Sequence, residues 1–269
     1  MTQDDPLRQV ECFLLDMDGT FYLGEELIEG SLEFIDALNR IGRRYLFLTN
    51  NSSKDSQQYA DKITRLGLTV SREKIMTSGE ATAMHVQSQS PGARVYVVGT
   101  QALEQEFARR GLLLTDESPD YAILGFDTTL TYAKLWKLCD LVRAGTPYIA
   151  THPDFNCPTE TGFMPDIGAM IAFVRASTER EPDLIVGKPN RLLVEKAAER
   201  TGVPVSRMCM VGDRLYTDIA LGATAGIPTV LVLSGETKLE EVAGSPHQPG
   251  IVFQNLAELA NHLLPNIMI

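Results

Sequence analysis

The chain has little of what marks secreted, membrane-spanning or disulfide-stabilised proteins. Its four cysteines stand singly and form no C-x-x-C pair, so neither a cysteine zinc site nor a disulfide framework is indicated. No apolar stretch reaches the ~18 residues expected of a membrane span. The segment Met1–Gln9 is polar and carries two aspartates, which is unlike a signal peptide. We therefore expect a cytoplasmic protein that does not act on membranes.

Runs of basic residues are also missing. The chain has 24 lysine and arginine residues against 35 aspartate and glutamate residues, a net charge of −11. This balance argues against nucleic acid as a partner. The negative net charge does not exclude a small anionic substrate, because a few nearby cations and a metal ion determine the electrostatic potential inside a cleft. The length of 269 residues fits one large domain or two ordinary ones.

A regular alternation of strand-like apolar runs with helix-like segments runs along the chain. This alternation is typical of βαβ units, and it predicts an α/β protein with a doubly wound, Rossmann-like parallel-sheet core. Because the chemical motifs lie outside residues 79–182, we expect that block to be an inserted, smaller α/β cap domain. Residues 1–78 and 183–269 then form the core. The strands expected beside these motifs are Glu11–Asp16, Arg44–Thr49, Leu184–Val186 and Met208–Val211.

Two carboxylates, Asp16 and Asp18, follow the apolar run Phe13–Leu15 directly. In an extended strand, residues two apart point to the same side, where two negative charges repel by ~4 kcal/mol at an effective dielectric of 20. Such a pair needs a cation or a shared proton. At the carboxyl end of a strand this pattern predicts a metal-supported nucleophile with a general acid/base. The alternative, an ordinary Asp-Gly turn, stays open for this motif alone.

A second polar motif, Thr49-Asn50-Asn51-Ser52, follows the next expected strand. Thr49 and Asn50 can donate hydrogen bonds to phosphate oxygens, and the helix that follows adds backbone N–H groups. We therefore take Thr49, Asn50 and Asn51 as candidate phosphate-binding residues. The alternative is that these residues only cap the helix, since all of them are good N-caps.

Two further motifs follow later strands. Lys188, between Gly187 and Pro189, supplies a positive charge for phosphate. Asp213 follows Gly212 and offers a hard oxygen ligand suited to Mg²⁺, and Asp218 is a candidate for orienting the metal ligands. Alternatively, Lys188 is a solvated surface residue and Asp218 only complements a helix dipole. Carboxylates, a hydroxyl, an amide and a lysine at the carboxyl ends of parallel strands suit a phosphate and a divalent cation.

These motifs, in this order, resemble those of the haloacid dehalogenase (HAD) superfamily of phosphohydrolases, and the resemblance spans nearly the whole chain. It implies that Asp16 is the nucleophile and Asp18 the general acid/base. It also implies that Mg²⁺ is held by the Asp16 carboxylate, the Asp18 backbone carbonyl and the Asp213 carboxylate. The Asp18 side chain separates phosphatases of this superfamily from its dehalogenases, which lack the second acid.

The block between the second and third motifs resembles the α/β (C2-type) cap of the NagD-like, 4-nitrophenylphosphatase-type group. The similarity to this group includes Ala150-Thr151-His152-Pro153-Asp154 within the block and Gly212–Ile219 beyond it. Relatives usually carry Asn or Asp where His152 stands. His152 is therefore a candidate for contacting the substrate, with a structural role inside the fold as the alternative.

The resemblance implies a Mg²⁺-dependent phosphatase that hydrolyses small phosphomonoesters, such as nucleotide or sugar phosphates, through an aspartyl-phosphate. Two alternatives stay open. A phosphotransferase or phosphomutase would use the same intermediate with a different acceptor, and a phospho-accepting receiver domain would combine similar residues in a much shorter chain. The sequence does not identify the substrate, and it leaves open whether the chain forms a homo-oligomer.

Overall fold

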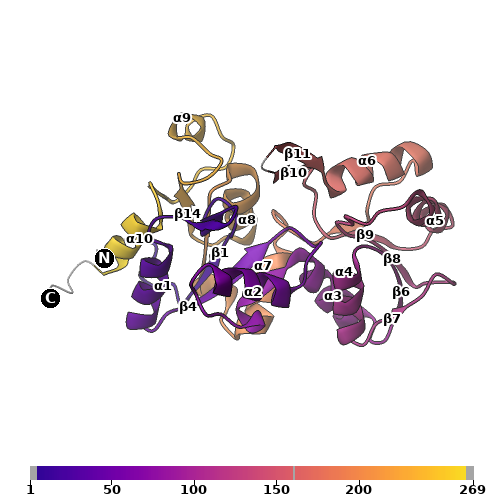
Figure 1. Ribbon diagram of the computed structural model, residues 1–269, viewed down its shortest axis with the longest axis horizontal. Helices are drawn as coiled ribbons and strands as arrows, with labels where there is room; N and C mark the ends of the chain where they lie inside the picture. The colour runs from indigo at the N-terminus through magenta and orange to yellow at the C-terminus, as the bar shows by residue number, and fades with distance from the viewer. Residues whose placement is uncertain (1–4, 160, 265–269) are drawn as a thin grey trace. The chain divides into compact units, whose positions relative to one another are not determined.

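The computed structural model describes residues 5–159 and 161–264 (Figure 1). It contains two compact units. The first unit comprises the chain up to Leu48, Ala60–Ile75 and the chain from Pro189 onward. The second comprises Thr49–Tyr59 and Met76–Lys188. No helix among the described residues is long and apolar enough to cross a membrane.

A six-stranded sheet in the order β15-β14-β13-β1-β4-β5 organises the first unit. The central strand β1 (Cys12–Leu15) pairs in parallel with β13 on one side and with β4 on the other. All four residues of β1 are buried, as expected for a parallel strand covered on both faces. The other strands of this sheet are β4 (Arg44–Thr49), β5 (Ile75–Thr77), β13 (Met208–Gly212), β14 (Thr229–Val232) and β15 (Ile251–Phe253).

The strand order reverses beside β1, because the chain proceeds from β1 to β4 on one side and later returns to β13 on the other. Polar side chains that follow β1 and β13 therefore meet at a switch point of the sheet, where ligands bind in open α/β folds. The register pairs Leu15 with Val211, so the residues after both strands lie at the same level.

Helices and a small hairpin complete the first unit. The apolar face of α1 (Ser31–Arg40) packs against the sheet, where Phe34 makes an edge-to-face contact with Phe13 of β1. Helix α10 (Leu256–Leu263) lies beside α1 (Figure 1). A small antiparallel hairpin of β2 (Tyr22–Leu23) and β3 (Glu26–Leu27) follows β1. The remaining helical segments are α7 (Leu192–Thr201), a π-helical turn (Leu215–Ile219), α8 (Ala220–Ala225), α9 (Leu239–Val242) and the 3₁₀ turns Arg72–Lys74 and Val205–Arg207. Helix α2 (Ser56–Arg65) has residues in both units.

The second unit contains a five-stranded parallel sheet in the order β12-β9-β8-β6-β7. Its strands are β6 (Arg94–Val98), β7 (Leu113–Leu114), β8 (Tyr121–Leu124), β9 (Tyr148–Ala150) and β12 (Leu184–Ile185), and an antiparallel hairpin joins β10 (Asn156–Thr159) to β11 (Gly162–Pro165). Its helices are α3 (Ser78–Gln89), α4 (Gln101–Arg109), α5 (Tyr132–Arg143) and α6 (Ile167–Thr178). Helices α5 and α6 lie side by side (Figure 1).

The predicted α/β class with a Rossmann-like parallel-sheet core is confirmed. One strand assignment is wrong. The segment Leu184–Val186 was expected in the core sheet, but its strand β12 pairs with β9 in the five-stranded sheet. The Asp183 carboxylate accepts a hydrogen bond from Tyr148 N (2.7 Å), which fixes the start of β12 beside β9.

Candidate active site

Asp16 stands directly after β1, and its backbone N–H donates to Val211 O of β13 (2.9 Å). The chain then turns sharply, because Met17 O accepts hydrogen bonds from the N–H groups of Phe21 (2.8 Å) and Tyr22 (3.1 Å). The Asp16 side chain is half-buried and that of Asp18 is exposed. The turn therefore places one carboxylate against the sheet end and the next one in solvent.

Asp213, directly after β13, is buried, and both of its carboxylate oxygens accept hydrogen bonds. Thr20 Oγ1 donates to Oδ1 (3.1 Å), and Glu236 N donates to Oδ2 (2.8 Å). Two glycines make room for this side chain. A Cβ atom at Gly19 would lie 2.4 Å from Asp213 Oδ2, and one at Gly235 would lie 2.1 Å from it. The turn after β1 and the loop after β14 thus form a fitted cradle for Asp213.

Asp218 lies in the π-helical turn and is completely buried. Its Oδ2 accepts a hydrogen bond from Arg214 N (3.1 Å), and Gly212 leaves it space, since a Cβ there would come within 2.4 Å of Asp218 Cβ. Burial and the negative charge of Asp218 together raise the pKa of Asp213 from 3.8 to about 6. The carboxylates of Asp213 and Asp218 therefore lie close together, and neighbouring groups offset only part of their negative charge.

One cation of the first unit faces this cluster. Arg214 lies 2.9 Å from Glu236 through Nε and Oε2. Burial alone lowers the pKa of its guanidinium, but the negative charges of Asp16, Glu236 and Asp213 raise that pKa above its ordinary value. Arg214 was not singled out in the sequence, because an arginine in a loop has no pattern that separates it from a solvated residue.

Asp16, Asp213 and Asp218 each offer an oxygen within 4.8 Å of the others. This set of hard oxygen donors fits a divalent cation such as Mg²⁺. The raised pKa of Asp213 agrees with this, because it marks a place where added positive charge would be stabilising. The structure therefore brings together three of the predicted site residues and leaves Asp18, whose backbone carbonyl was the predicted ligand, at the exposed edge.

Within the second unit, the Asn50 side chain holds the backbone of Lys188. Asn50 Oδ1 accepts from Lys188 N (2.8 Å), and Nδ2 donates to Lys188 O (3.1 Å) and to Asp154 Oδ2 (3.1 Å). Gly187 allows this approach, because a Cβ there would lie 2.6 Å from Asn50 Oδ1. Lys188 itself is almost fully buried, so it is not the solvated surface lysine of the alternative interpretation.

Thr49 and Asn51 form a local turn. Thr49 Oγ1 accepts from Asn51 N (3.1 Å), while Asn51 Oδ1 accepts from both the N–H (2.9 Å) and the hydroxyl (2.7 Å) of Ser53. These contacts match the turn chemistry of the alternative interpretation for this motif. The predicted role of Thr49 and Asn51 in phosphate binding stays a prediction.

His152 is completely buried in the second unit. Its Nε2 lies 3.0 Å from Asp166 Oδ1, and its Nδ1 lies 3.2 Å from Thr151 Oγ1 and 3.4 Å from Ser78 Oγ. A buried ring with both nitrogens occupied has the surroundings of a structural histidine. These contacts therefore favour the structural alternative for His152 over direct contact with a substrate.

Asp166, the partner of His152, was missed in the sequence. Its Oδ1 also accepts from Ile167 N (2.7 Å) as the N-cap of α6. The available signal was an aspartate just before an apolar helical run, which predicts a cap but does not predict a histidine partner far away in the sequence.

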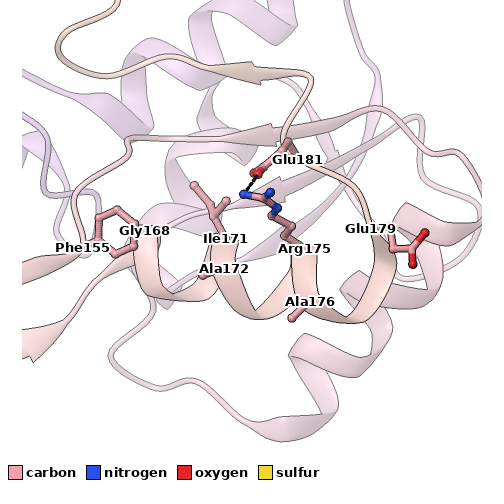
Figure 2. Close-up of a pocket in the computed structure, with 8 residues that line it drawn as sticks. All are labelled: Phe155, Gly168, Ile171, Ala172, Arg175, Ala176, Glu179 and Glu181. Carbon is pink, nitrogen blue, oxygen red and sulfur yellow. Dashed lines mark ion pairs between the residues drawn. The ribbon is translucent and has the colours of Figure 1, made fainter.

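A hollow of about 570 Å³ runs along α6 in the second unit (Figure 2). Figure 2 shows Phe155 near one end, Ile171 in the middle and the ion pair of Arg175 with Glu181, whose Nη1 and Oε1 are 2.9 Å apart. None of the predicted site residues lines it, so it is separate from the groups described above.

The chain is similar to phosphatases over almost its whole length. Models of the families described as haloacid dehalogenase-like hydrolase and HAD-hydrolase-like match residues 13–113 and 185–259. The acid sugar phosphatase of Staphylococcus aureus (strain MRSA252) is 38% identical over 253 residues, which cover 94% of this chain and 97% of that protein. The 5′-nucleotidase YutF of Bacillus subtilis (strain 168) is 37% identical over 252 residues, which cover 94% and 98%.

Solved structures of phosphatases are also similar to this chain. The 4-nitrophenylphosphatase of Thermotoga maritima superposes with a TM-score of 0.93 at 49% identity, covering 96% of this chain and 98% of that one. The glycerol phosphate phosphatase of Mycobacterium tuberculosis, solved in complex with magnesium, has a TM-score of 0.87 at 32% identity and covers 95% of this chain and 78% of that one.

The chain belongs to the haloacid dehalogenase-like hydrolase family. Within it, the chain is a phosphatase of the NagD-like, 4-nitrophenylphosphatase-type group, a phosphoric monoester hydrolase that acts on small phosphate substrates. The predicted family and enzyme class are confirmed, and the alternative of a receiver domain is excluded.

Proposed function

We propose that this phosphatase requires Mg²⁺ and hydrolyses its substrates through an aspartyl-phosphate on Asp16. The observation that supports this most is the cluster of Asp16, Asp213 and Asp218, whose oxygens lie within 4.8 Å of one another. Carboxylates this close are stabilised when a cation offsets their charge, and Mg²⁺ prefers such oxygen ligands. A related phosphatase has been solved with magnesium.

Asp16, Asp213 and the Asp18 backbone carbonyl are the proposed ligands. When bound, Mg²⁺ would offset the negative charge of the phosphoryl oxygens. Asp218 is proposed to orient the metal ligands rather than to bind the metal itself. Its carboxylate accepts a hydrogen bond from Arg214 N, and its negative charge helps to raise the pKa of Asp213.

The proposed reaction has two steps. An oxygen of the Asp16 carboxylate attacks the phosphorus atom, the bond from phosphorus to the ester oxygen breaks, and Asp18 transfers its proton to that oxygen, which leaves as the alcohol. Asp18, now a carboxylate, then takes a proton from water. The water oxygen attacks the aspartyl-phosphate, which releases inorganic phosphate and restores Asp16. The exposed side chain of Asp18 suits a group that must reach the substrate.

Thr49, Asn50, Asn51 and Lys188 are proposed to bind the phosphate, on the strength of their sequence motifs. The buried ammonium of Lys188 supplies the positive charge. The two hydrogen bonds between Asn50 and the Lys188 backbone support this indirectly, because they fix the main chain from which the lysine projects.

Residues 79–182 are proposed to form a cap that selects among leaving groups, with sugar phosphates and nucleotides as the first candidate substrates. These two classes are chosen because they are the substrates named for the similar S. aureus and B. subtilis enzymes. We further propose that the enzyme acts in the cytoplasm without nucleic acid or membrane partners. This agrees with its four free cysteines and its net charge of −11.

The experiment is a panel of phosphomonoesters assayed by release of inorganic phosphate, with Mg²⁺, after chelation, and with Ca²⁺ in place of Mg²⁺. We expect activity only with Mg²⁺, and inhibition by Ca²⁺, because Ca²⁺ accepts more ligands at longer distances and does not align Asp16 for in-line attack. Full activity in chelator would reject the metal proposal. Activity on no sugar phosphate or nucleotide would reject the substrate proposal alone.

A further inference from the structure

A polar cavity lies at the opposite end of the six-stranded sheet from the carboxylates. Its volume is about 420 Å³. It is formed where three neighbouring parallel strands begin, because Glu11 precedes β1, Arg43 precedes β4 and Arg207 precedes β13, and the register pairs Cys12 with both Arg44 and Met208. At ~3.3 Å per residue, β1 separates this cavity from Asp16 by about 15 Å.

The charge of the cavity is opposite to that of the chain. Its lining carries the four arginines Arg8, Arg43, Arg44 and Arg207 against a single carboxylate, Glu11. The whole chain has only 24 lysine and arginine residues against 35 acidic ones. A concave site with three excess positive charges in such a chain attracts anions, because low-dielectric walls focus the field of the charges that line them.

Neutral carbonyl groups, rather than carboxylates, hold three of the guanidinium groups in place. Arg43 donates to Leu7 O (2.6 Å) and Arg8 O (3.0 Å). Arg44 donates to Thr201 O (2.6 Å), and Arg207 donates to Gln9 O (3.3 Å). Carbonyl groups orient an arginine without neutralising it, so the charge and the remaining N–H donors stay available.

Glu11, the one carboxylate in the lining, offsets little of the positive charge of the cavity. Arg207 Nη1 lies 3.6 Å from Glu11 Oε1, and both side chains are about half exposed, so water screens this pair. Burial lowers the pKa of the Arg43 guanidinium, and the negative charge of nearby Asp5 offsets this effect only in part.

We propose that this cavity binds a compact, multivalent anion of the phosphate class, such as pyrophosphate or the phosphate groups of a nucleoside diphosphate. Planar guanidinium groups bind phosphate oxygens in pairs, and several converging arginines match an ion that carries more than one negative charge. The volume lies within the range of about 300–1,000 Å³ for small-molecule sites. The site is independent of the proposed phosphatase reaction, which takes place at the other end of β1.

Calorimetric titration with pyrophosphate tests this proposal. It is carried out in chelator at low ionic strength, so that the proposed metal site contributes nothing. We expect saturable binding that weakens about tenfold or more in Arg8→Gln and in Arg207→Gln, since each loses charge-assisted hydrogen bonds. The matched control is Arg65→Gln, which removes the same charge from an exposed position of α2 outside the cavity and should bind normally.

Parallel titrations with inorganic phosphate, ADP and a DNA oligonucleotide define the ligand. Tighter binding of ADP than of pyrophosphate would assign the site to nucleotides, and the reverse order would assign it to inorganic polyphosphate. Binding that persists in both cavity variants, or is lost equally in Arg65→Gln, overturns the proposal. So does loss of binding in Asp16→Asn, because the anion would then occupy the other end of the sheet. Binding of DNA with no binding of pyrophosphate also overturns it.

Discussion

Single carboxylates carry most of the proposed chemistry, and the structure distinguishes them by surroundings that the sequence does not show. Asp16 and Asp18 are two residues apart, yet the turn at Met17 leaves one half-buried and the other exposed. Asp213 and Asp218 look alike in sequence, but both carboxylate oxygens of Asp213 accept hydrogen bonds from Thr20 and Glu236, whereas Asp218 is fully buried behind Gly212.

Asp16→Asn should lower turnover by about three orders of magnitude or more, as loss of a covalent nucleophile does in other enzymes. The change keeps the size of the side chain, so thermal unfolding should change little. Phosphate release under saturating substrate measures the loss. Asp36→Asn is the matched control, because Asp36 lies exposed on α1 in an ion pair with Arg40. Turnover within tenfold of the unchanged protein would contradict the nucleophile assignment.

Stability of the metal-free protein should depend on pH through Asp213, whose pKa rises from 3.8 to about 6 on folding because of burial and Asp218. A raised pKa means that the folded state holds the proton more tightly. Its stabilising contribution is therefore complete below about pH 4 and is lost as the pH rises through about 6. A shift of this size is worth roughly 3 kcal/mol.

Thermal unfolding in chelator across this pH range checks the prediction. The loss of stability should be smaller in Asp213→Asn, which has no such proton to release. Added Mg²⁺ should raise Tm more above pH 6 than below pH 4, because it binds the ionised carboxylates. A Tm increase from Mg²⁺ that is the same at both ends of the range would contradict the account.

The short strands include both correct and incorrect sequence-based predictions. β1 was predictable, because four consecutive apolar residues end in a polar turn, and the hairpin at Gly24 was predictable from its glycine. β12 was placed in the wrong sheet, because a strand of two residues carries no information about its neighbour, and its position depends on the contact of Asp183 with β9. The three carboxylates that the structure brings together, Asp16, Asp213 and Asp218, were predictable from motifs that follow strands, but the partners of His152 were not.

Gly19→Ala should cost most of the activity and weaken Mg²⁺ binding. The added Cβ would lie 2.4 Å from Asp213 Oδ2 and would push that carboxylate away. The control is Gly24→Ala in the next hairpin. Gly24 also has a positive φ (59°, against 90° at Gly19), but a Cβ there meets nothing within 4 Å. Both changes strain the backbone, so the difference in kcat and in Mg²⁺ affinity measures the clash. Equal effects would show that backbone strain alone matters.

His152→Ala should destabilise the protein by about 2–4 kcal/mol, because it leaves a cavity and a buried Asp166 without its partner. Thermal unfolding gives the loss, with His85→Ala on α3, a partly exposed position, as the control. Relative kcat/KM values across the phosphomonoester panel separate the two interpretations of His152. Unchanged ranking supports the structural role, and a changed ranking with unchanged stability would support direct contact with substrate.

Across the whole molecule, the four free thiols should differ sharply in reactivity. Cys12, Cys139 and Cys209 are buried, and burial raises the pKa of Cys12 to about 12, whereas Cys157 is partly exposed. A thiol reagent should therefore modify one cysteine quickly and the other three only on unfolding. Cys157→Ser should remove the fast phase. Two or more fast thiols in the native protein would contradict the burial described for these side chains.

The first unit is assembled from three separate stretches of chain, and this has a consequence for synthesis on the ribosome. β1 needs β13 as its neighbour, but β13 begins 196 residues after β1 (208 minus 12). Because the ribosome adds about 5–20 residues per second, β13 is synthesised roughly 10–40 s after β1. The residues of the second unit end at Lys188, so they have all been synthesised before β13 appears. We therefore expect nascent chains to protect the second unit from protease first, while the apolar β1 segment relies on chaperones.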